Sequence, residues 1–188
     1  MGNKESMFRE IIAGLSSRDE RVQERIYVHY WGYLMGISTR YFKDRNIARE
    51  VVNDSFIKAF KTMYDFRHDN NILDFQKTFR VWLAKITVRT ALDKIRAQKT
   101  ALIYVEEYHE VKGNHIEIEQ QLFAEDILKL LYDLPDLHRT VFNLYEIEGF
   151  SHDEIANMLA IPVSSSRTYL TRAKHKLREL YKKSIEIN

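Results

Sequence analysis

The most informative segment of the chain runs from Ser151 to Lys174 and reads SHDEIANMLAIPVSSSRTYLTRAK. It opens with a capping-box pattern, because Glu154 follows Ser151 at the spacing that lets each side chain bond the other residue's backbone N–H. Apolar residues at helical spacing come next, then the turn-like Ala160-Ile161-Pro162, then a long basic helix. A short helix, a tight turn and a second helix with polar N-terminal residues predict a helix-turn-helix motif, which binds DNA through its second helix.

One face of that second helix is predicted to contact DNA, because Val163, Leu170 and Ala173 fall on the opposite, inward face. Arginine can bond guanine O6 and N7, hydroxyls can bond bases or phosphates, and lysines suit backbone phosphates. The residues expected to contact DNA are Ser164, Ser165, Arg167, Thr168, Thr171, Arg172, Lys174 and Lys176. The alternative is an amphipathic surface helix whose polar residues are only solvated.

The first hundred residues show helical periodicity with few breakers, and they predict four packed helices. The helices are expected over about residues 5–14, from a capping box of Ser17 and Glu20 to about 41, over 46–64 and over 75–98. The inward stripe of the third is Ile47, Val51, Phe56, Phe60 and Met63, and that of the fourth is Phe79, Trp82, Leu83, Ile86 and Leu92. The polar stretch 65–71 between them is predicted to be a loop.

Charge alternates along the chain in four blocks, although the formal net charge is only +2. Residues 1–99 carry +7, 100–118 carry −3, 119–149 carry −5 and 150–188 carry +3. Two basic segments around an acidic middle indicate two polyanion-binding surfaces, with chance clustering on solvated helix faces as the alternative. We therefore expect an all-α protein of two small helical domains, residues 1–99 and 119–188, joined by an acidic linker over 100–118 that follows a positively charged surface.

Several classes of function are excluded or disfavoured by composition. The sequence has no cysteine, which excludes disulfides, thiolate catalysis and cysteine-based zinc sites. No stretch approaches the roughly 18 apolar residues of a membrane span, and the polar start lacks a signal-peptide hydrophobic region, so a cytoplasmic location is expected. His109 and His115 in the linker match no familiar metal-ligand spacing, and no catalytic motif appears. We predict no enzyme activity, no cofactor and no metal site.

An ordered set of short motifs resembles the extracytoplasmic-function sigma factors, the smallest group of the sigma-70 class. Those similar to the family's C-terminal domain, which reads the −35 promoter element, are Leu134-Pro135, Val141-Phe142, Glu148-Gly149-Phe150-Ser151, Glu154-Ile155-Ala156 and Arg172-Ala173-Lys174. Upstream, residues 48–60 are similar to the helix that binds the polymerase clamp. Residues 79–86 and 91–96 resemble the helix bordering the −10 reading site.

The resemblance implies a protein that binds core RNA polymerase and directs promoter-specific initiation by reading duplex −35 DNA and single-stranded −10 DNA. It also implies that an anti-sigma factor masks the polymerase-binding surface. The outward residues of the third helix expected to contact the polymerase are Arg49, Glu50, Asn53, Asp54, Ile57 and Lys58.

Opening a promoter requires unpaired bases to be held, which needs a basic track with aromatic or apolar pocket walls. The loop before the fourth helix, and that helix itself, supply the candidates. The possible pocket walls are Phe66 and Phe75, the possible base contacts are Arg67, His68, Asn70 and Asn71, and the possible phosphate contacts are Lys77, Arg80, Arg89 and Arg96. Phe79 and Trp82 are assigned to the core.

Three residues depart from the family's usual pattern. Arg89 stands where the family often has Asn, and Ala160 replaces a common Gly in the turn. Ser166 occupies a usually apolar inward position, where its hydroxyl is expected to bond a backbone carbonyl one turn earlier. The main rival interpretation is a stand-alone helix-turn-helix regulator with residues 1–99 as a sensing domain, and an enzyme is a distant third.

Overall fold

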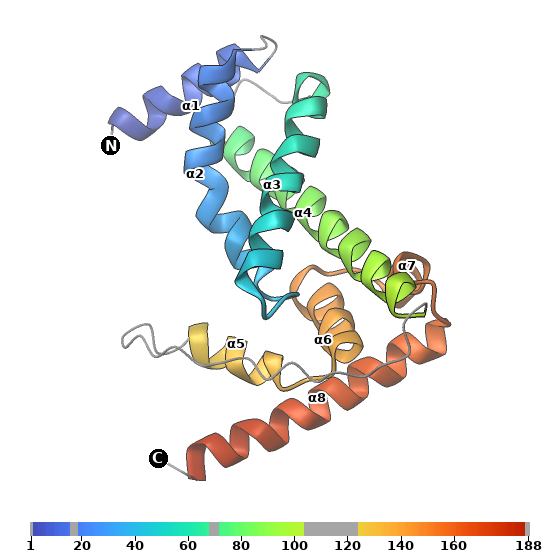
Figure 1. The fold of residues 1–188 in the computed structure, drawn as a ribbon. Coiled ribbons are helices and arrows are strands. Elements are labelled where there is room, and N and C mark those ends of the chain that lie inside the picture. The colour runs from blue at the N-terminus through green and yellow to red at the C-terminus, as the bar shows by residue number, and fades with distance from the viewer. Residues whose placement is uncertain (1, 16–18, 68–71, 104–123, 187–188) are drawn as a thin grey trace. The chain divides into compact units, whose positions relative to one another are not determined.

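A computed structural model describes the chain except for residues 1, 16–18, 68–71, 104–123 and 187–188. The described residues form helices and contain no strand, as the all-α prediction required (Figure 1). Their contacts divide the chain into two compact units, Met1–Ala97 and Gln98–Asn188, which we call the N-terminal unit and the C-terminal unit. Among the described residues, no helix is long and apolar enough to cross a membrane.

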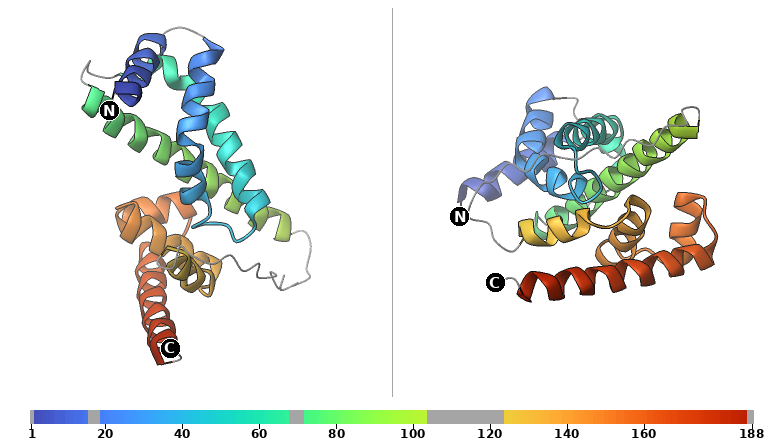
Figure 2. Two further views of the ribbon diagram at one scale, coloured as in Figure 1. Left: turned by 90° about the vertical axis from the view of Figure 1, so that its left-hand side faces the viewer. Right: turned by 60° about the horizontal axis from the view of Figure 1, so that its bottom comes forward.

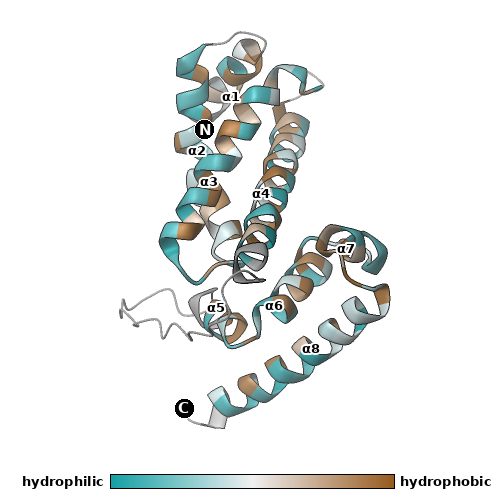
Figure 3. Cartoon of the chain, turned by 45° about the vertical axis from the view of Figure 1, so that its right-hand side comes forward, coloured by the Kyte–Doolittle hydropathy of each residue, from teal (hydrophilic) through white to brown (hydrophobic). Residues whose placement is uncertain are grey.

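The N-terminal unit is built from α1 (Gly2–Gly14), α2 (Glu20–Ser38), α3 (Arg45–Thr62), the short 3-10 helix η1 (Met63–Asp65) and α4 (Ile72–Ile103), whose last residues pass the unit boundary. Its core is filled by aromatic and branched side chains. Phe8 of α1 meets Phe75 of α4 with ring centroids 6.4 Å apart, and Tyr30 of α2 meets Phe79 of α4 at 5.6 Å. Figure 3 shows the corresponding hydrophobic stripes on these helices, with hydrophilic residues on their other faces.

The C-terminal unit contains α5 (Ala124–Tyr132), α6 (Asp136–Phe142), the π-helical turn η2 (Asn143–Ile147), α7 (His152–Leu159) and α8 (Val163–Glu186). The three shorter helices all pack on α8: α7 lies near its N-terminal end, α6 along its middle and α5 toward its C-terminal half (Figures 1 and 2). Leu131, Leu134 and Ala173 form a buried cluster there, with Phe142 and Leu177 against it. A small core therefore joins α8 to the three shorter helices, and most of the opposite side of α8 faces solvent.

Some helix ends differ from those predicted. The side chain of Asp19 accepts from the backbone N–H of Arg21 and caps α2, so the predicted capping box of Ser17 and Glu20 is wrong. The fourth helix is longer than predicted at both ends, and residues 100–103 are helical rather than linker. Ala and Leu at its end are strong helix formers, which explains the extension. The rest of the predicted linker, with His109 and His115, lies outside the described residues.

Candidate nucleic-acid and polymerase interfaces

The turn between α7 and α8 has the geometry of a helix-turn-helix. Ser151 and Glu154 form the predicted capping box at the start of α7. Ala160 ends α7 in the left-handed conformation, with φ 52° and ψ 49°. The backbone N–H of Ile161 then bonds the carbonyl oxygen of Ala156 at 3.1 Å, and α8 begins at Val163. The sharp change of direction presents the first turns of α8 as a separate surface.

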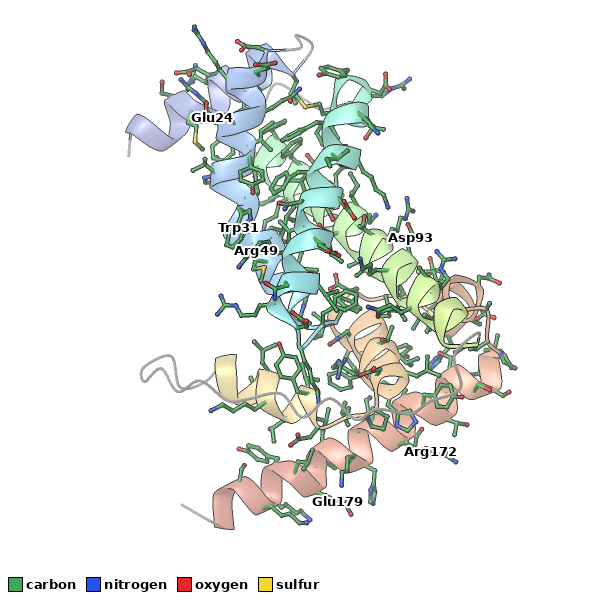
Figure 4. All side chains as sticks on the ribbon, viewed as in Figure 1. Glu24, Trp31, Arg49, Asp93, Arg172 and Glu179 are labelled. Atoms are coloured by element: carbon green, nitrogen blue, oxygen red, sulfur yellow. The ribbon has the colours of Figure 1, made fainter. Side chains whose placement is uncertain are left out.

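That surface contains the side chains predicted to contact DNA. Arg167 and Arg172 are exposed, and Figure 4 shows Arg172 on α8. The hydroxyls of Thr168 and Thr171 donate to backbone carbonyls one turn earlier, at 2.9 and 3.0 Å, so their remaining lone pairs can accept from a base. Ser164 is exposed and Ser165 half-buried on the same turns. The structure therefore brings these six residues together on the first half of α8.

The two lysines predicted on this helix differ in surroundings. Lys174 forms an ion pair with Glu146 of η2 at 2.6 Å and is partly buried, so it connects α8 to the preceding turn. Its expected role as a phosphate contact stays a prediction. Lys176 is exposed.

Ser166 makes a different contact from the one expected. Its side chain is fully buried, and its hydroxyl lies 2.9 Å from Nδ1 of His152 on α7 rather than against a carbonyl of its own helix. The ring of His152 also stacks on Tyr145 of η2, with centroids 4.4 Å apart. Ser166 and His152 therefore join the two helices of the motif through a polar contact. The buried position of Ser166 was visible in the sequence, but its partner, fourteen residues away, was not.

His138 is a further residue beside this surface that the sequence did not single out. Its ring lies 5.1 Å from that of Tyr169 on α8. Burial, together with the positive charge of Arg172, holds the pKa of His138 below its ordinary value. The imidazole is thus next to a candidate DNA-contacting arginine.

In the N-terminal unit, one of the two predicted pocket-wall aromatics is available. Phe66 is half-buried. Its ring packs against two rings of α4, with its centroid 5.1 Å from that of Trp82 and 5.2 Å from that of Phe79. Phe75 has no exposed surface and stacks on Phe79 at 5.1 Å. The assignment of Phe75 as a pocket wall is therefore corrected: it is a core residue, because helical spacing placed it on the same stripe as Phe79.

The four predicted phosphate contacts on α4 do not form one track. All are exposed, but Arg80 and Arg89 are two and a half turns apart at about 3.6 residues per turn and so lie on opposite sides of the helix. Lys77 lies on the side of Arg80, and Arg96 on the side of Arg89 and Trp82. Arg96 also bonds Asp93 at 2.5 Å. Arg67 is exposed, whereas His68, Asn70 and Asn71 lie outside the described residues.

The predicted polymerase-binding face of α3 is exposed as expected, and Figure 4 labels Arg49 on it. Arg49, Asp54 and Ile57 project from the same side, and Ile57 is 53% exposed, which is high for an isoleucine. The other three residues have partners within the unit. Glu50 pairs with Lys94 at 2.5 Å, Lys58 with Asp93 at 3.0 Å, and Asn53 accepts from the hydroxyl of Tyr27 at 3.2 Å.

These ion pairs shift the pKa values of two residues of α4, Asp93 and Lys94. The hydrogen bond from Lys94 to Glu50 raises the pKa of Lys94, against the opposing effect of burial. Partial burial works to raise the pKa of Asp93, but the hydrogen bonds and charges of Lys58 and Arg96 together outweigh it and hold that pKa below its ordinary value. The Glu50–Lys94 and Lys58–Asp93 ion pairs therefore join this face of α3 to α4, while Arg49, Asp54 and Ile57 stay exposed.

Comparison with known proteins agrees with this arrangement. The family model for "Sigma-70, region 4" matches residues 124–177, which span α5 to the middle of α8. The RNA polymerase sigma-H factor of Pseudomonas aeruginosa is 25% identical over 178 residues, covering 88% of this chain and 89% of that protein. The ECF RNA polymerase sigma-E factor of Haemophilus influenzae is 27% identical over 178 residues, covering 87% and 89%.

A solved structure shares the fold. It is the sigma factor RpoE of Bartonella quintana in complex with the anti-sigma factor NepR, with a TM-score of 0.54, 19% identity and coverage of 85% of this chain and 96% of that one.

Proposed function

Because the chain belongs to the extracytoplasmic-function sigma factors of the sigma-70 family, we propose that its two units read two promoter elements while it is bound to core RNA polymerase. The observation that carries the proposal is the exposed surface on the first half of α8, presented by a helix-turn-helix within the region that the family model matches. The similarity to sigma factors extends over more than four-fifths of the chain, which a stand-alone regulator with an unrelated sensing domain would not explain.

The C-terminal unit is assigned to duplex −35 DNA. Arg167 and Arg172 are the proposed base contacts because both are exposed on the first half of α8, with Ser164, Ser165, Thr168 and Thr171 on the same turns. Arginine bidentate to guanine is the commonest specific base contact in the major groove. Lys176 is available for a backbone phosphate, and Lys174 acts through its ion pair with Glu146.

The N-terminal unit is assigned to unpaired −10 DNA on the side of α4 that carries Trp82, against which Phe66 packs. Trp82 was expected in the core, but it is half-buried. The two rings offer a stacking surface, and Arg67, Arg89 and Arg96 supply positive charge on that side. The other predicted base contacts, His68, Asn70 and Asn71, come directly after Arg67 in the sequence. Lys77 and Arg80 lie on the other side of the helix and require a separate explanation.

The polymerase is assigned to the exposed residues Arg49, Asp54 and Ile57 of the α3 face. An exposed isoleucine between two charges resembles the mixture of apolar and charged groups in protein interfaces. An anti-sigma factor is expected to compete with the polymerase for the chain, since the similar Bartonella protein was solved in complex with an anti-sigma factor. A partner of RNA polymerase and promoter DNA acts in the cytoplasm.

Transcription with core polymerase on a library of promoters tests the proposal. We expect initiation only when the chain is added, and selection of promoters that share two sequence elements. A chain that binds one duplex operator tightly without polymerase, and adds no initiation, would be a stand-alone regulator instead.

The polymerase face can be tested in the same assay. Asp54→Lys with Ile57→Asp should reduce binding to core polymerase, and Glu24→Lys, a charge reversal at an exposed residue of α2, is the matched control. Unchanged affinity of the folded double variant would refute the assignment of this face.

A further inference from the structure

A cavity of about 320 Å³ lies in the N-terminal unit among α1, α2 and α4. Four aromatic rings line it, those of Phe8, His29, Tyr30 and Tyr33. From α4 it is lined by Gln76, Lys77 and Arg80, and none of its lining residues in the described part of the chain is acidic. Aromatic walls combined with two permanent cations are the surroundings that proteins provide for nucleotides.

The cations are placed for a phosphate. The guanidinium of Arg80 lies over the ring of Tyr33, 4.1 Å from its centroid. A guanidinium has five N–H donors, so the contact with the ring leaves donors for the two parallel hydrogen bonds that a phosphate accepts. Lys77 lies one helical turn earlier on the same side of α4, so both charges act on one place.

The floor of the cavity is aromatic. Phe8 and Tyr30 are 1% and 5% exposed, and the edge-on ring of His29 packs against them with centroids 5.2 and 4.8 Å away. Burial raises the pKa of Tyr30 to about 12, although Arg80 acts to lower it. The hydroxyl therefore stays protonated at physiological pH and can donate a hydrogen bond to a base or a ribose.

We propose that this cavity binds one nucleotide, with its base against His29 and the tyrosines and its phosphate held by Lys77 and Arg80. The volume is at the small end of the roughly 300–1,000 Å³ of ligand pockets, which suits a single unit of this size. The cavity is on the opposite side of α4 from Phe66 and Arg89, so it is distinct from the −10 surface assigned above. The nucleotide has two possible sources, a free nucleotide or an unpaired nucleotide of the promoter, and only the second rests on the proposed function.

The first experiment tests a free nucleotide with AMP as the probe, added to the full chain and followed by calorimetry. If the free nucleotide is the source, Lys77→Gln with Arg80→Gln should raise the Kd at least about tenfold, as loss of charge-assisted hydrogen bonds does. His29→Ala should weaken AMP binding through the base, and adenosine or inorganic phosphate alone should bind less well than AMP. Lys85→Gln, an exposed cation elsewhere on α4, is the control and should bind as wild type does.

The second experiment tests the promoter strand. Holoenzyme is assembled on promoters with 2-aminopurine at one position of the unpaired strand at a time, and fluorescence reports stacking. If the strand is the source, the fluorescence of 2-aminopurine at one position should be quenched with wild-type protein and restored with His29→Ala. His29 lies outside the −10 surface, so the fluorescence change on His29→Ala tests the cavity and not the proposed function. The proposed function is measured separately, by the transcription yield of wild-type protein in the same samples.

The outcomes separate the two sources. AMP binding that depends on His29 and on the two cations, without a fluorescence change, supports the free nucleotide. Quenched fluorescence at one position that His29→Ala restores supports the promoter strand as the source, whether or not AMP binds. No AMP binding, or AMP binding equal in all variants, together with fluorescence that His29→Ala leaves unchanged, overturns the proposal even if transcription is normal.

Discussion

Ala160 carries the turn of the helix-turn-helix with a left-handed backbone that alanine adopts at a cost. Glycine adopts the same φ and ψ without that cost, because it has no Cβ. Ala160→Gly should therefore raise the free energy of unfolding of the C-terminal unit by about 0.5–1 kcal/mol, measured by urea denaturation.

Gly149 is the converse control. It has φ +78° and open space where a Cβ would lie, so Gly149→Ala tests the backbone alone and should lower stability by about 1 kcal/mol. A loss of stability with Ala160→Gly would show that the turn gains from the methyl group of the alanine.

The contact between Ser166 and His152 predicts a measurable coupling between α7 and α8. Ser166→Ala removes the hydrogen-bond partner of the half-buried imidazole and should cost about 1 kcal/mol of stability. His152→Phe keeps a ring for stacking on Tyr145 and removes the hydrogen bond. In a double-mutant cycle the two changes should be non-additive, since they remove one interaction. Additive effects would mean that packing alone joins the helices.

His138 predicts a pH dependence of stability. Because its pKa is lowered in the folded state, the folded chain favours the neutral ring. The contribution of His138 to folding stability is complete above the pKa of the ring in the unfolded chain, about 6.5. It is lost as the pH falls from there through the lower pKa of the folded state. His138→Gln should therefore lose less stability than wild type between pH 7 and 5, measured by urea denaturation. An identical pH profile in both proteins would contradict this.

At the scale of helices, periodicity predicted which elements exist but not where they end. The stripe through Val51 and Phe56 identified α3, since burial of one face repeats every turn. Asp19 and Ser17 are both good capping residues, and the choice of Asp19 depends on where the chain enters α2. The same limit applies to Phe75, because a helical aromatic at the end of a stripe fits either core or surface equally well until packing is known.

The helix-turn-helix was the best-predicted element because its signals are local: a cap, a turn and an amphipathic helix. The pairing of Lys174 with Glu146 was not predictable, since it joins residues 28 positions apart through the fold of η2 against α8. The separation of Arg80 from Arg89, in contrast, was predictable, because nine residues within the one helix expected over 75–98 place them on opposite sides.

The first half of α8 predicts a sequence-specific defect. Arg167→Ala should cost about 1–3 kcal/mol in −35 binding and relax the preference at one base pair, as loss of a bidentate base contact does. Lys182→Gln, exposed on the far part of α8, is the control and should leave the preference unchanged. The measurement is the yield from a randomised −35 library with holoenzyme. Equal weakening on all sequences would identify Arg167 as a phosphate contact.

At the scale of the whole molecule, two compact units with separate DNA surfaces predict that the isolated chain binds promoters poorly. Attachment to polymerase makes the second contact intramolecular and raises its effective concentration. Removing several residues between positions 104 and 114 should therefore abolish initiation at two-element promoters while each unit stays folded. Reversal of Glu106, Glu107 and Glu110 to lysine should also weaken initiation, if the segment follows a basic surface. Full activity in both variants would make this segment an inert tether.

The π-helical turn η2 has a consequence for how the chain tolerates changes of length. The backbone N–H of Glu148 bonds the carbonyl of Asn143, five residues back, so this turn holds one residue more than an α-helical turn. Deleting one residue inside 143–147 converts it to an ordinary turn, whereas the same deletion in α8 rotates every later side chain by about 100°. We therefore expect the loss of one residue to be tolerated better in η2 than in the first half of α8, because only the second deletion turns the DNA-facing arginines away.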